Sequence, residues 1–216
     1  MLDAGAQLTA VEIDPVLVDV LRNRADLKRA TIVAGDARTF DYATLARSGK
    51  WYAAGNLPYY IATPLIMQLI ELQRGPQALT VMVQRDVADR FTAPPGTAAY
   101  GSLTVAVGYA MNVTRVLTLE PAAFSPKPKV SSAVVQMIRR TEPAVRTRDL
   151  ARFRQVVRAA FAYRRKTLAN SLALALRVDR HSVEQALRSA GIPTEQRGER
   201  LDLADFARLA DALAEG

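Results

Sequence analysis

Apolar, strand-like segments alternate with amphipathic, helix-like ones along the first 90 residues, and few folds accommodate such an alternation. Four apolar segments, most of them rich in β-branched residues, predict strands at 7–13, 31–34, 51–55 and 78–84. Helices are predicted from Asp14-Pro15 and Thr63-Pro64, where a capping side chain precedes a proline, and at about 86–91. This order is typical of an α/β fold, in which helices cover both faces of a mostly parallel sheet.

The next part of the chain extends this sheet and then changes character. Two further strands are predicted at 103–109 and 130–138, and because no clear helix separates them we expect an antiparallel hairpin at one edge. From about residue 140 the pattern is helical, with helices predicted at about 149–176, 183–190 and 203–213. The chain is thus predicted to form an α/β domain at 1–140 and a small all-helical C-terminal domain at 141–216.

Positive charge is concentrated in one part of the chain. The 216 residues carry a formal net charge of +8. Residues 121–170 hold 12 Lys and Arg against only Glu142 and Asp149, a charge of +10, whereas the rest holds 17 basic and 19 acidic residues, a charge of −2. Such a local excess is typical of a surface that binds a polyanion, and a solvated basic face without a ligand is the alternative.

Composition excludes several classes of protein. The absence of cysteine excludes disulfides and thiolate chemistry. The single histidine, His181, lies in a polar stretch, and no metal site can be built around it. No apolar run approaches the ~18 residues of a membrane span, and the N-terminus lacks the pattern of a secretion signal. We therefore expect a cytoplasmic monomer with no metal site and no membrane contact.

The sequence Asn56-Leu57-Pro58-Tyr59, which follows the predicted strand at 51–55, is the strongest indication of chemistry. The Asn side-chain oxygen and a backbone carbonyl freed by Pro58 can both accept hydrogen bonds from one exocyclic amine, and the Tyr ring can lie on the face of a planar base. The four residues therefore predict a pocket for a base that carries an NH2 group. A tight turn after a strand is the alternative, because Asn-x-Pro also suits turns.

Two carboxylates follow the first two predicted strands, as Asn56 follows the third. Glu12 could accept both hydroxyls of a ribose, and Asp36 could accept from an adenine amine. Ligands of open α/β sheets bind beyond the carboxyl ends of the strands, so three polar residues at successive strand ends favour a binding site. Taken singly, Glu12 could instead be a charge at a helix N-terminus, and Asp36 could form an Asx turn after Gly35.

In these motifs the chain resembles a known family. The blocks Val11-Glu12-Ile13-Asp14, Gly35-Asp36-Ala37 and Asn56-Leu57-Pro58-Tyr59 are similar to those of the S-adenosylmethionine-dependent rRNA adenine N6,N6-dimethyltransferases, in particular the small-subunit (16S) branch, often called the KsgA type. Further blocks agree with this branch at 100–101, 124–130, 132–135, 161–168 and 197–199. The resemblance covers essentially all 216 residues.

The resemblance implies a class I (Rossmann-like) methyltransferase sheet, S-adenosylmethionine as cofactor, and dimethylation of two adjacent adenosines near the 3′ end of 16S rRNA in the immature small subunit. Glu12 and Asp36, with their neighbours Ile13 and Ala37, would hold the cofactor, and Asn56 would also contact it. Asn56 and the Leu57 carbonyl would hold the target N6, and Pro58 belongs to the same catalytic motif. Tyr59 would stack on the flipped base and Phe124 would close on its other face. Phosphates would be bound by Lys127, Lys129, Arg164, Arg165 and Lys166.

One part of the family pattern is absent. Family members carry a first strand and a glycine-rich turn that approaches the cofactor, and Met1-Leu2-Asp3-Ala4-Gly5-Ala6 resembles the end of the helix after that turn. The missing strand is expected at the sheet centre, between those that end at Glu12 and Asn56. We therefore expect the chain as given to bind S-adenosylmethionine weakly or not at all.

Two alternatives remain open. The large-subunit (23S) rRNA methyltransferases of the macrolide-resistance (Erm) type share the fold and a similar Asn-aliphatic-Pro-aromatic motif; the block at 124–130 and Arg197-Gly198-Glu199 favour the small-subunit type. A ribosome-assembly factor that binds RNA without catalysis is the other. Methyl transfer to immature 30S particles, compared with 50S precursors, separates all three.

Overall fold

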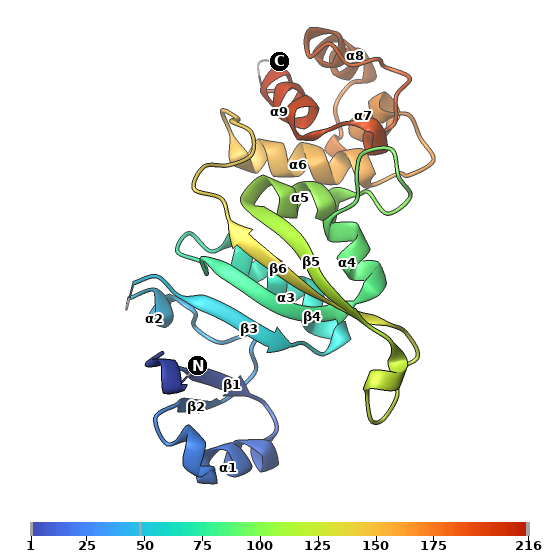
Figure 1. Ribbon diagram of the computed structural model, residues 1–216. Helices are drawn as coiled ribbons and strands as arrows, with labels where there is room; N and C mark the ends of the chain where they lie inside the picture. Colours follow the sequence, from blue (N-terminus) through green and yellow to red (C-terminus); the bar gives the residue numbers. More distant parts are fainter. Residues whose placement is uncertain (1, 48, 215–216) are drawn as a thin grey trace. The chain divides into compact units, whose positions relative to one another are not determined.

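The computed structural model describes residues 2–47 and 49–214, which divide into two compact units (Figure 1). The first unit is formed by residues up to 51 together with 60–75, and the second by residues 52–59 together with those from 76 onward. The expected α/β class, with parallel strands and an antiparallel hairpin, is confirmed.

The first unit contains a two-stranded parallel sheet and short helices. Strand β1 (Thr9–Glu12) pairs with β2 (Thr31–Ala34), and the register places Glu12 beside Ala34. Between them, helix α1 (Pro15–Asn23) begins as predicted, because the Asp14 side chain accepts from the first free backbone N–H groups. The other elements of this unit are η1 (Leu2–Ala4), η2 (Ala25–Leu27), α2 (Ala43–Ala46) and, from Tyr60 onward, helix α3 (Tyr59–Glu71).

Helix α3 (Tyr59–Glu71) begins earlier than predicted. The expected start at Thr63-Pro64 is wrong, since Pro64 lies inside the helix and removes one backbone hydrogen bond there. Leu65, Ile66 and Leu69 form one face of this helix and are almost fully buried. We infer that burial of this face outweighs the cost of the proline.

The second unit is built on a four-stranded mixed sheet with the order β3-β4-β6-β5. Its strands are β3 (Tyr52–Asn56), β4 (Ala78–Gln84), β5 (Met111–Leu119) and β6 (Ser132–Arg139). Strands β3 and β4 are parallel, whereas β6 is antiparallel to both of its neighbours, β4 and β5. The expected antiparallel hairpin is therefore β5–β6. Helix α4 (Arg85–Phe91) follows β4, close to the predicted range.

The strand predicted at 103–109 is wrong, because this segment is helix α5 (Ser102–Ala110) and the edge strand β5 follows it directly. The run is apolar throughout, so neither a two-residue nor a 3.6-residue period stands out in its sequence. A tertiary contact favours the helix: the Thr104 hydroxyl accepts from Gly101 N (3.1 Å) and donates to the Arg90 carbonyl (2.6 Å).

The C-terminal segment is helical as expected, but the helix predicted at 149–176 is two helices. Its elements are α6 (Leu150–Phe161), α7 (Leu168–Leu176), α8 (Arg180–Ser189), η4 (Gly198–Arg200) and α9 (Leu203–Ala212). The break lies in an exposed turn, in which Lys166 N donates to the Tyr163 carbonyl (2.9 Å). At the start of α7, Leu168 N donates to the Gln196 carbonyl (2.7 Å), a partner that only the tertiary fold supplies.

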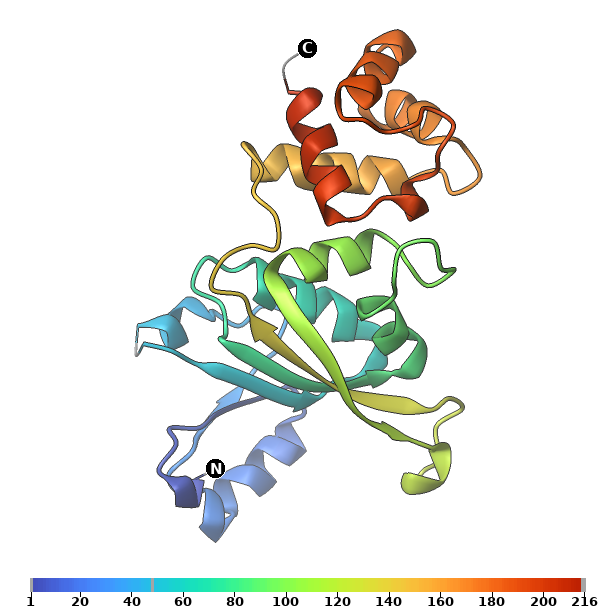
Figure 2. The ribbon, with the colours of Figure 1, turned by 45° about the horizontal axis from the view of Figure 1, so that its top comes forward.

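Helices α6–α9 share one hydrophobic core with α5, which lies between them and the sheet (Figure 2). Phe153, Leu172 and Phe206 are fully buried in this core, together with Tyr100 and Val105 from the segment before α6. The buried Tyr100 hydroxyl donates to the Leu201 carbonyl (2.7 Å), and burial raises the pKa of this phenol. The predicted domain boundary at 140/141 stays a prediction.

Candidate active site

Glu12 and Asp36 lie at the same edge of the first unit. Because β1 and β2 are parallel, their carboxyl ends meet, and Gly35 N donates to the Glu12 carbonyl (2.9 Å) directly before Asp36. The carboxyl ends of these two strands thus lie together in this unit, where ligands of α/β sheets usually bind.

Glu12 is half-buried, and a backbone N–H group restrains its side chain. Its Oε1 accepts from Asp14 N (2.9 Å), whereas Oε2 has no hydrogen bond from the residues that the structure describes. The next side chain, Ile13, is 64% exposed although it is apolar. A fixed carboxylate with an available oxygen, beside an exposed apolar side chain, suits a ribose and the flat face of the attached base.

Asp36 lies in a turn in which Arg38 donates hydrogen bonds to the Asp36 carboxylate from both its backbone and its side chain. The Asp36 Oδ1 accepts from Arg38 N (2.8 Å), and the guanidinium forms a bidentate pair with Nε and Nη2 at 3.0 and 2.6 Å from Oδ2. This pair lowers the pKa of the Asp36 carboxyl, chiefly through the side-chain hydrogen bonds. Asp36 is therefore an ionised acceptor at neutral pH. The sequence analysis did not identify Arg38.

A cluster of aromatic residues supports this turn and was also missed. The Tyr42 hydroxyl donates to the Ala37 carbonyl (2.7 Å). The Tyr42 ring stacks on Trp51 with centroids 5.9 Å apart, and Trp51 Nε1 donates to the Arg74 carbonyl (3.0 Å). Burial raises the pKa of Tyr42, so the phenol stays a donor. These contacts fix the backbone of residues 36–38 from one side.

In the second unit, Asn56, Ser132 and the segment 120–131 lie at one edge of the sheet. Asn56 ends β3, and the carboxyl end of the parallel strand β4 lies beside it. Because β6 is antiparallel, Ser132 at its start pairs with Gln84 at the end of β4 and with Leu119 at the end of β5. The connection from β5 to β6, which includes η3 (Pro121–Ala123), therefore extends from the same edge (Figure 1).

The Asn56-Leu57-Pro58-Tyr59 motif follows β3 without secondary structure at Leu57 and Pro58. Asn56 is exposed, and its amide makes no hydrogen bond with the part of the chain that the structure describes. Leu57 folds back over Gly55, where a Cβ atom would lie 3.1 Å from Leu57 Cδ2. A glycine at position 55 thus allows the close turn that presents Asn56 and the Leu57 backbone.

The Tyr59 side chain is held by a hydrogen bond at its hydroxyl group. Its hydroxyl lies 2.7 Å from Ser132 Oγ, and Ser132 is fully buried at the start of β6. This hydrogen bond restrains the phenol ring at the edge where Asn56 ends its strand. No sequence pattern pointed to this contact of Ser132, although a serine at the start of a largely apolar strand was a possible signal.

The segment between β5 and β6 carries three other predicted site residues. Phe124 is half-buried directly after η3, and its N–H donates to the Pro121 carbonyl (3.2 Å). Lys127 and Lys129 are exposed farther along. The structure therefore places an aromatic ring and two cations on the connection that extends from the edge of Asn56.

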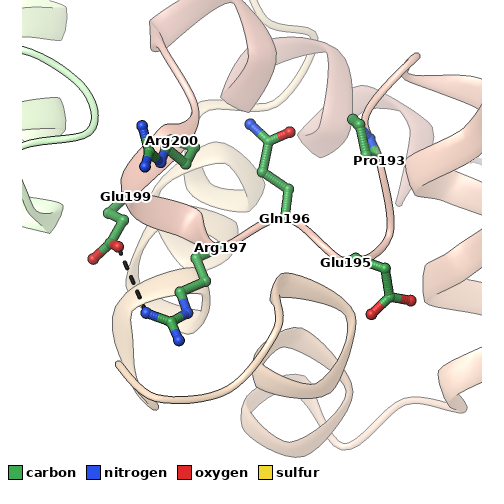
Figure 3. A pocket seen from close by; sticks show the side chains of 6 residues that line it. All are labelled: Pro193, Glu195, Gln196, Arg197, Glu199 and Arg200. Carbon is green, nitrogen blue, oxygen red and sulfur yellow. Dashed lines mark ion pairs between the residues drawn. The ribbon is translucent and has the colours of Figure 1, made fainter.

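The predicted basic cluster, Arg164, Arg165 and Lys166, forms the exposed turn between α6 and α7. Arg164 Nη2 donates to the Ala98 carbonyl (3.1 Å), and Arg164 and Lys166 line a small cavity together with Arg197. Arg197 also lines an adjoining open groove of about 580 Å³ with Gln196 and Arg200, where it faces Glu199 at 3.9 Å (Figure 3). Arg197 therefore extends the basic cluster, which its sequence position did not reveal.

Across residues 2–47 and 49–214, no three carboxylate or imidazole side chains gather in a way that could bind a metal ion. In the same residues, no helix has both the length and the apolar character of a membrane span.

The chain is similar to proteins of one known family. The family model described as "Ribosomal RNA adenine dimethylase" matches residues 1–215. The ribosomal RNA small subunit methyltransferase A of Clostridium botulinum is 36% identical over 215 residues, which cover 99% of this chain and 78% of that protein. Its namesake from Hahella chejuensis is 40% identical, with 98% and 76% covered. A crystal structure of a dimethyladenosine transferase from Plasmodium falciparum has a TM-score of 0.76 at 22% identity, with 94% and 80% covered, which shows a shared fold.

Proposed function

Because the chain belongs to the ribosomal RNA adenine dimethylase family, we propose that it dimethylates N6 of two adjacent adenosines near the 3′ end of 16S rRNA. Members of this family use S-adenosylmethionine as the methyl donor. The match over residues 1–215 carries the proposal, and relatives named as small-subunit methyltransferases support the choice of substrate.

The carboxyl edge of the first unit fits the nucleoside part of the cofactor. Glu12 would accept the ribose hydroxyls through the oxygen that Asp14 does not use. Asp36 would accept from the adenine amine, and Ile13 and Ala37 would contact the ring. When bound, S-adenosylmethionine supplies a methyl group on a sulfonium, which needs no further activation by the protein.

The edge that carries Asn56 fits the target adenine. The N6 lone pair of adenine is delocalised into the ring, so the amine is a poor nucleophile. Asn56 Oδ1 and the Leu57 carbonyl would each accept one N6 hydrogen, which favours a pyramidal nitrogen with its lone pair available. These residues act by positioning and by electrostatic stabilisation, and no general base is needed to begin the transfer.

Aromatic side chains would hold the base once it has left the RNA stack. Tyr59, with its hydroxyl fixed by Ser132, would lie on one face of the adenine. Phe124, on the connection between β5 and β6, would close on the other face. Stacking of this kind recognises any flat base, so the selection of adenine falls to Asn56 and Leu57.

Exposed cations would bind the RNA backbone. Lys127 and Lys129 extend from the Asn56 edge, and the cluster of Arg164, Arg165 and Lys166 occupies the turn between α6 and α7. Contacts with phosphate are independent of sequence and weaken steeply with salt. Selection of the small subunit would then depend on RNA shape and on unpaired bases. We further propose that the enzyme acts as a cytoplasmic monomer on immature small subunits.

The decisive experiment measures methyl transfer from labelled S-adenosylmethionine to immature 30S particles and to 50S precursors. We expect label in two adjacent adenosines of 16S rRNA only. Label in 23S rRNA would instead support the large-subunit alternative. Tight binding to 30S particles without transfer would support a non-catalytic assembly factor. Asn56→Ala should bind the particles as wild type does and transfer methyl groups much more slowly, which separates catalysis from RNA binding.

A further inference from the structure

The Asp36 carboxylate receives most of its hydrogen bonds from one residue, Arg38. A carboxylate offers about four acceptor positions. Oδ1 accepts from Arg38 N (2.8 Å) and Nε (3.2 Å), and Oδ2 accepts from Nε (3.0 Å) and Nη2 (2.6 Å). Three N–H groups of one residue therefore bind the two carboxylate oxygens, and the single Nε–H lies within reach of both. An adenine amine that binds Oδ2 must compete with the two guanidinium N–H groups at this oxygen.

We propose that Arg38 is an internal competitor for the cofactor adenine, so that it sets both the affinity and the base selectivity of the Asp36 site. The proposal rests on the proposed function of Asp36 as the acceptor of the adenine amine. Arg38 is a specificity-determining residue in this scheme and takes no part in the chemical step.

The geometry allows the exchange. The Arg38 side chain is 53% exposed, whereas that of Asp36 is 21% exposed. The guanidinium can therefore rotate into solvent, where water replaces its partners, while the carboxylate stays in place. Arg38 N still donates to Oδ1 after this rotation, because it belongs to the backbone of the turn that Tyr42 supports. Oδ2 then has both of its acceptor positions available for the amine.

The competition also affects which base is accepted. A guanidinium only donates hydrogen bonds, and an ionised carboxylate only accepts them. Adenine presents an amine at position 6, which suits Asp36 alone, whereas hypoxanthine presents a carbonyl oxygen, which suits Arg38. With both side chains present, the site should discriminate less sharply between the two bases than Asp36 would by itself.

The chain contains a matched control pair. Arg24 binds Asp26 across the same two-residue spacing and also through two guanidinium N–H groups, Nε to Oδ1 at 3.0 Å and Nη2 to Oδ2 at 2.7 Å. This pair belongs to the same unit and follows helix α1, and its side chains are 56% and 62% exposed. Arg24→Met thus removes an equivalent charge and ion pair without changing Asp36.

The experiment compares wild type, Arg38→Met, Arg38→Lys and Arg24→Met in binding to S-adenosylhomocysteine and S-inosylhomocysteine. Ligand-observed NMR measures dissociation constants into the millimolar range, so weak binding is still quantified. We expect Arg38→Met to bind S-adenosylhomocysteine roughly two- to fivefold more tightly, the range set by exposed ion pairs. Arg38→Lys should lie between it and wild type, and Arg24→Met should equal wild type.

Selectivity gives the second measurement. The preference for the adenosyl over the inosyl ligand should rise in Arg38→Met by more than the gain in adenosyl affinity, because the inosyl ligand loses a donor. The gain should shrink at high salt, which screens the ion pair in wild type. Equal affinities and equal selectivity in Arg38→Met and wild type would overturn the competition.

Asp36→Asn separates this inference from the proposed function. If Asp36 binds the adenine amine, Asp36→Asn should reduce the adenosyl preference. Loss of preference in Asp36→Asn without any change in Arg38→Met would disprove the role of Arg38 and retain that of Asp36. An unchanged preference in Asp36→Asn, or no binding by any variant, would overturn the proposed adenine site and the competition with it.

Discussion

The edge that carries Glu12 and Asp36 and the edge that carries Asn56 and Tyr59 are built differently. In the first unit, every residue of β1 is only half-buried, and α1 has one buried residue, Val18. In the second unit, alternate residues of β4 and β6 are fully buried, including Leu79 and Val135. One binding edge thus belongs to a thin two-stranded sheet, and the other to a sheet with a dense core.

This difference shows two ways to hold a binding residue. Asp36 is positioned by contacts that are short in sequence, to Arg38 and through the Tyr42–Ala37 hydrogen bond. Tyr59 is positioned by Ser132, which lies 73 residues away along the chain and is buried. Local contacts need little tertiary structure but leave side chains exposed to competition, whereas packing fixes a side chain more firmly.

The largest expected effect is on the free energy of unfolding when a buried side chain is shortened in each unit. Leu79→Ala should lower the free energy of unfolding of the second unit by about 2–5 kcal/mol, because it leaves a cavity beside fully buried neighbours. Val18→Ala in α1 should cost about 1 kcal/mol, since fewer carbon atoms are lost and the surroundings are more exposed. Urea unfolding monitored for each unit by NMR measures both. Equal losses would contradict the difference in packing.

Asn56→Ala tests whether the well-packed edge carries catalysis. We expect the rate of methyl transfer to fall by about 10²–10³, as when one preorganised hydrogen-bonding group is lost from an active site. The melting temperature should not change, because Asn56 is exposed. Asn112→Ala, which removes another exposed strand asparagine from β5, is the control and should retain the wild-type rate.

Loss of the hydrogen bond between Tyr59 and Ser132 should have a smaller effect on the rate of methyl transfer. Tyr59→Phe keeps the ring for stacking and removes the hydrogen bond to Ser132, which is worth about 1 kcal/mol, so the rate of transfer should fall roughly fivefold. Ser132→Ala should give a similar loss, and the double variant should cost no more than either single one. Additive losses would show that the two side chains act independently.

The smallest effect concerns the charge of Asp36. The Arg38 pair lowers the pKa of this carboxyl, so Arg38→Met should raise it toward the ordinary value of about 3.9. Any stability that the pair provides is present above that value and is lost as the pH falls through the lowered pKa. A carboxyl-carbon NMR titration measures the shift. An unchanged pKa in Arg38→Met would show that backbone hydrogen bonds alone hold Asp36.

Sequence patterns located the polar residues at the strand ends better than they assigned every element around them. The strand at 78–84 was predicted with its observed bounds, and Glu12 and Asn56 do end their strands. These features depend on local composition and on a polar residue after an apolar run, which the sequence contains directly. The roles assigned to these residues in cofactor and base binding remain predictions.

The failures share a physical cause. The segment 102–110 forms a helix although its apolar run also suits a strand, and the basic stretch at 162–167 interrupts what reads as one helix. In both segments the observed structure is stabilised by a hydrogen bond to a residue outside the segment. Thr104 binds the Arg90 carbonyl, and Leu168 binds the Gln196 carbonyl. No local pattern contains such partners.

The amino-acid order alone was sufficient for the class of fold and for the polar residues at the strand ends, because periodicity and turn chemistry act over a few neighbouring residues. Only the folded chain determined that Ser132 anchors Tyr59 and that Arg197 joins the basic turn. It also showed that Arg38 fills the Asp36 carboxylate. Hydrogen bonds and ion pairs depend on distances of about 3 Å and on direction, which the backbone must first bring about.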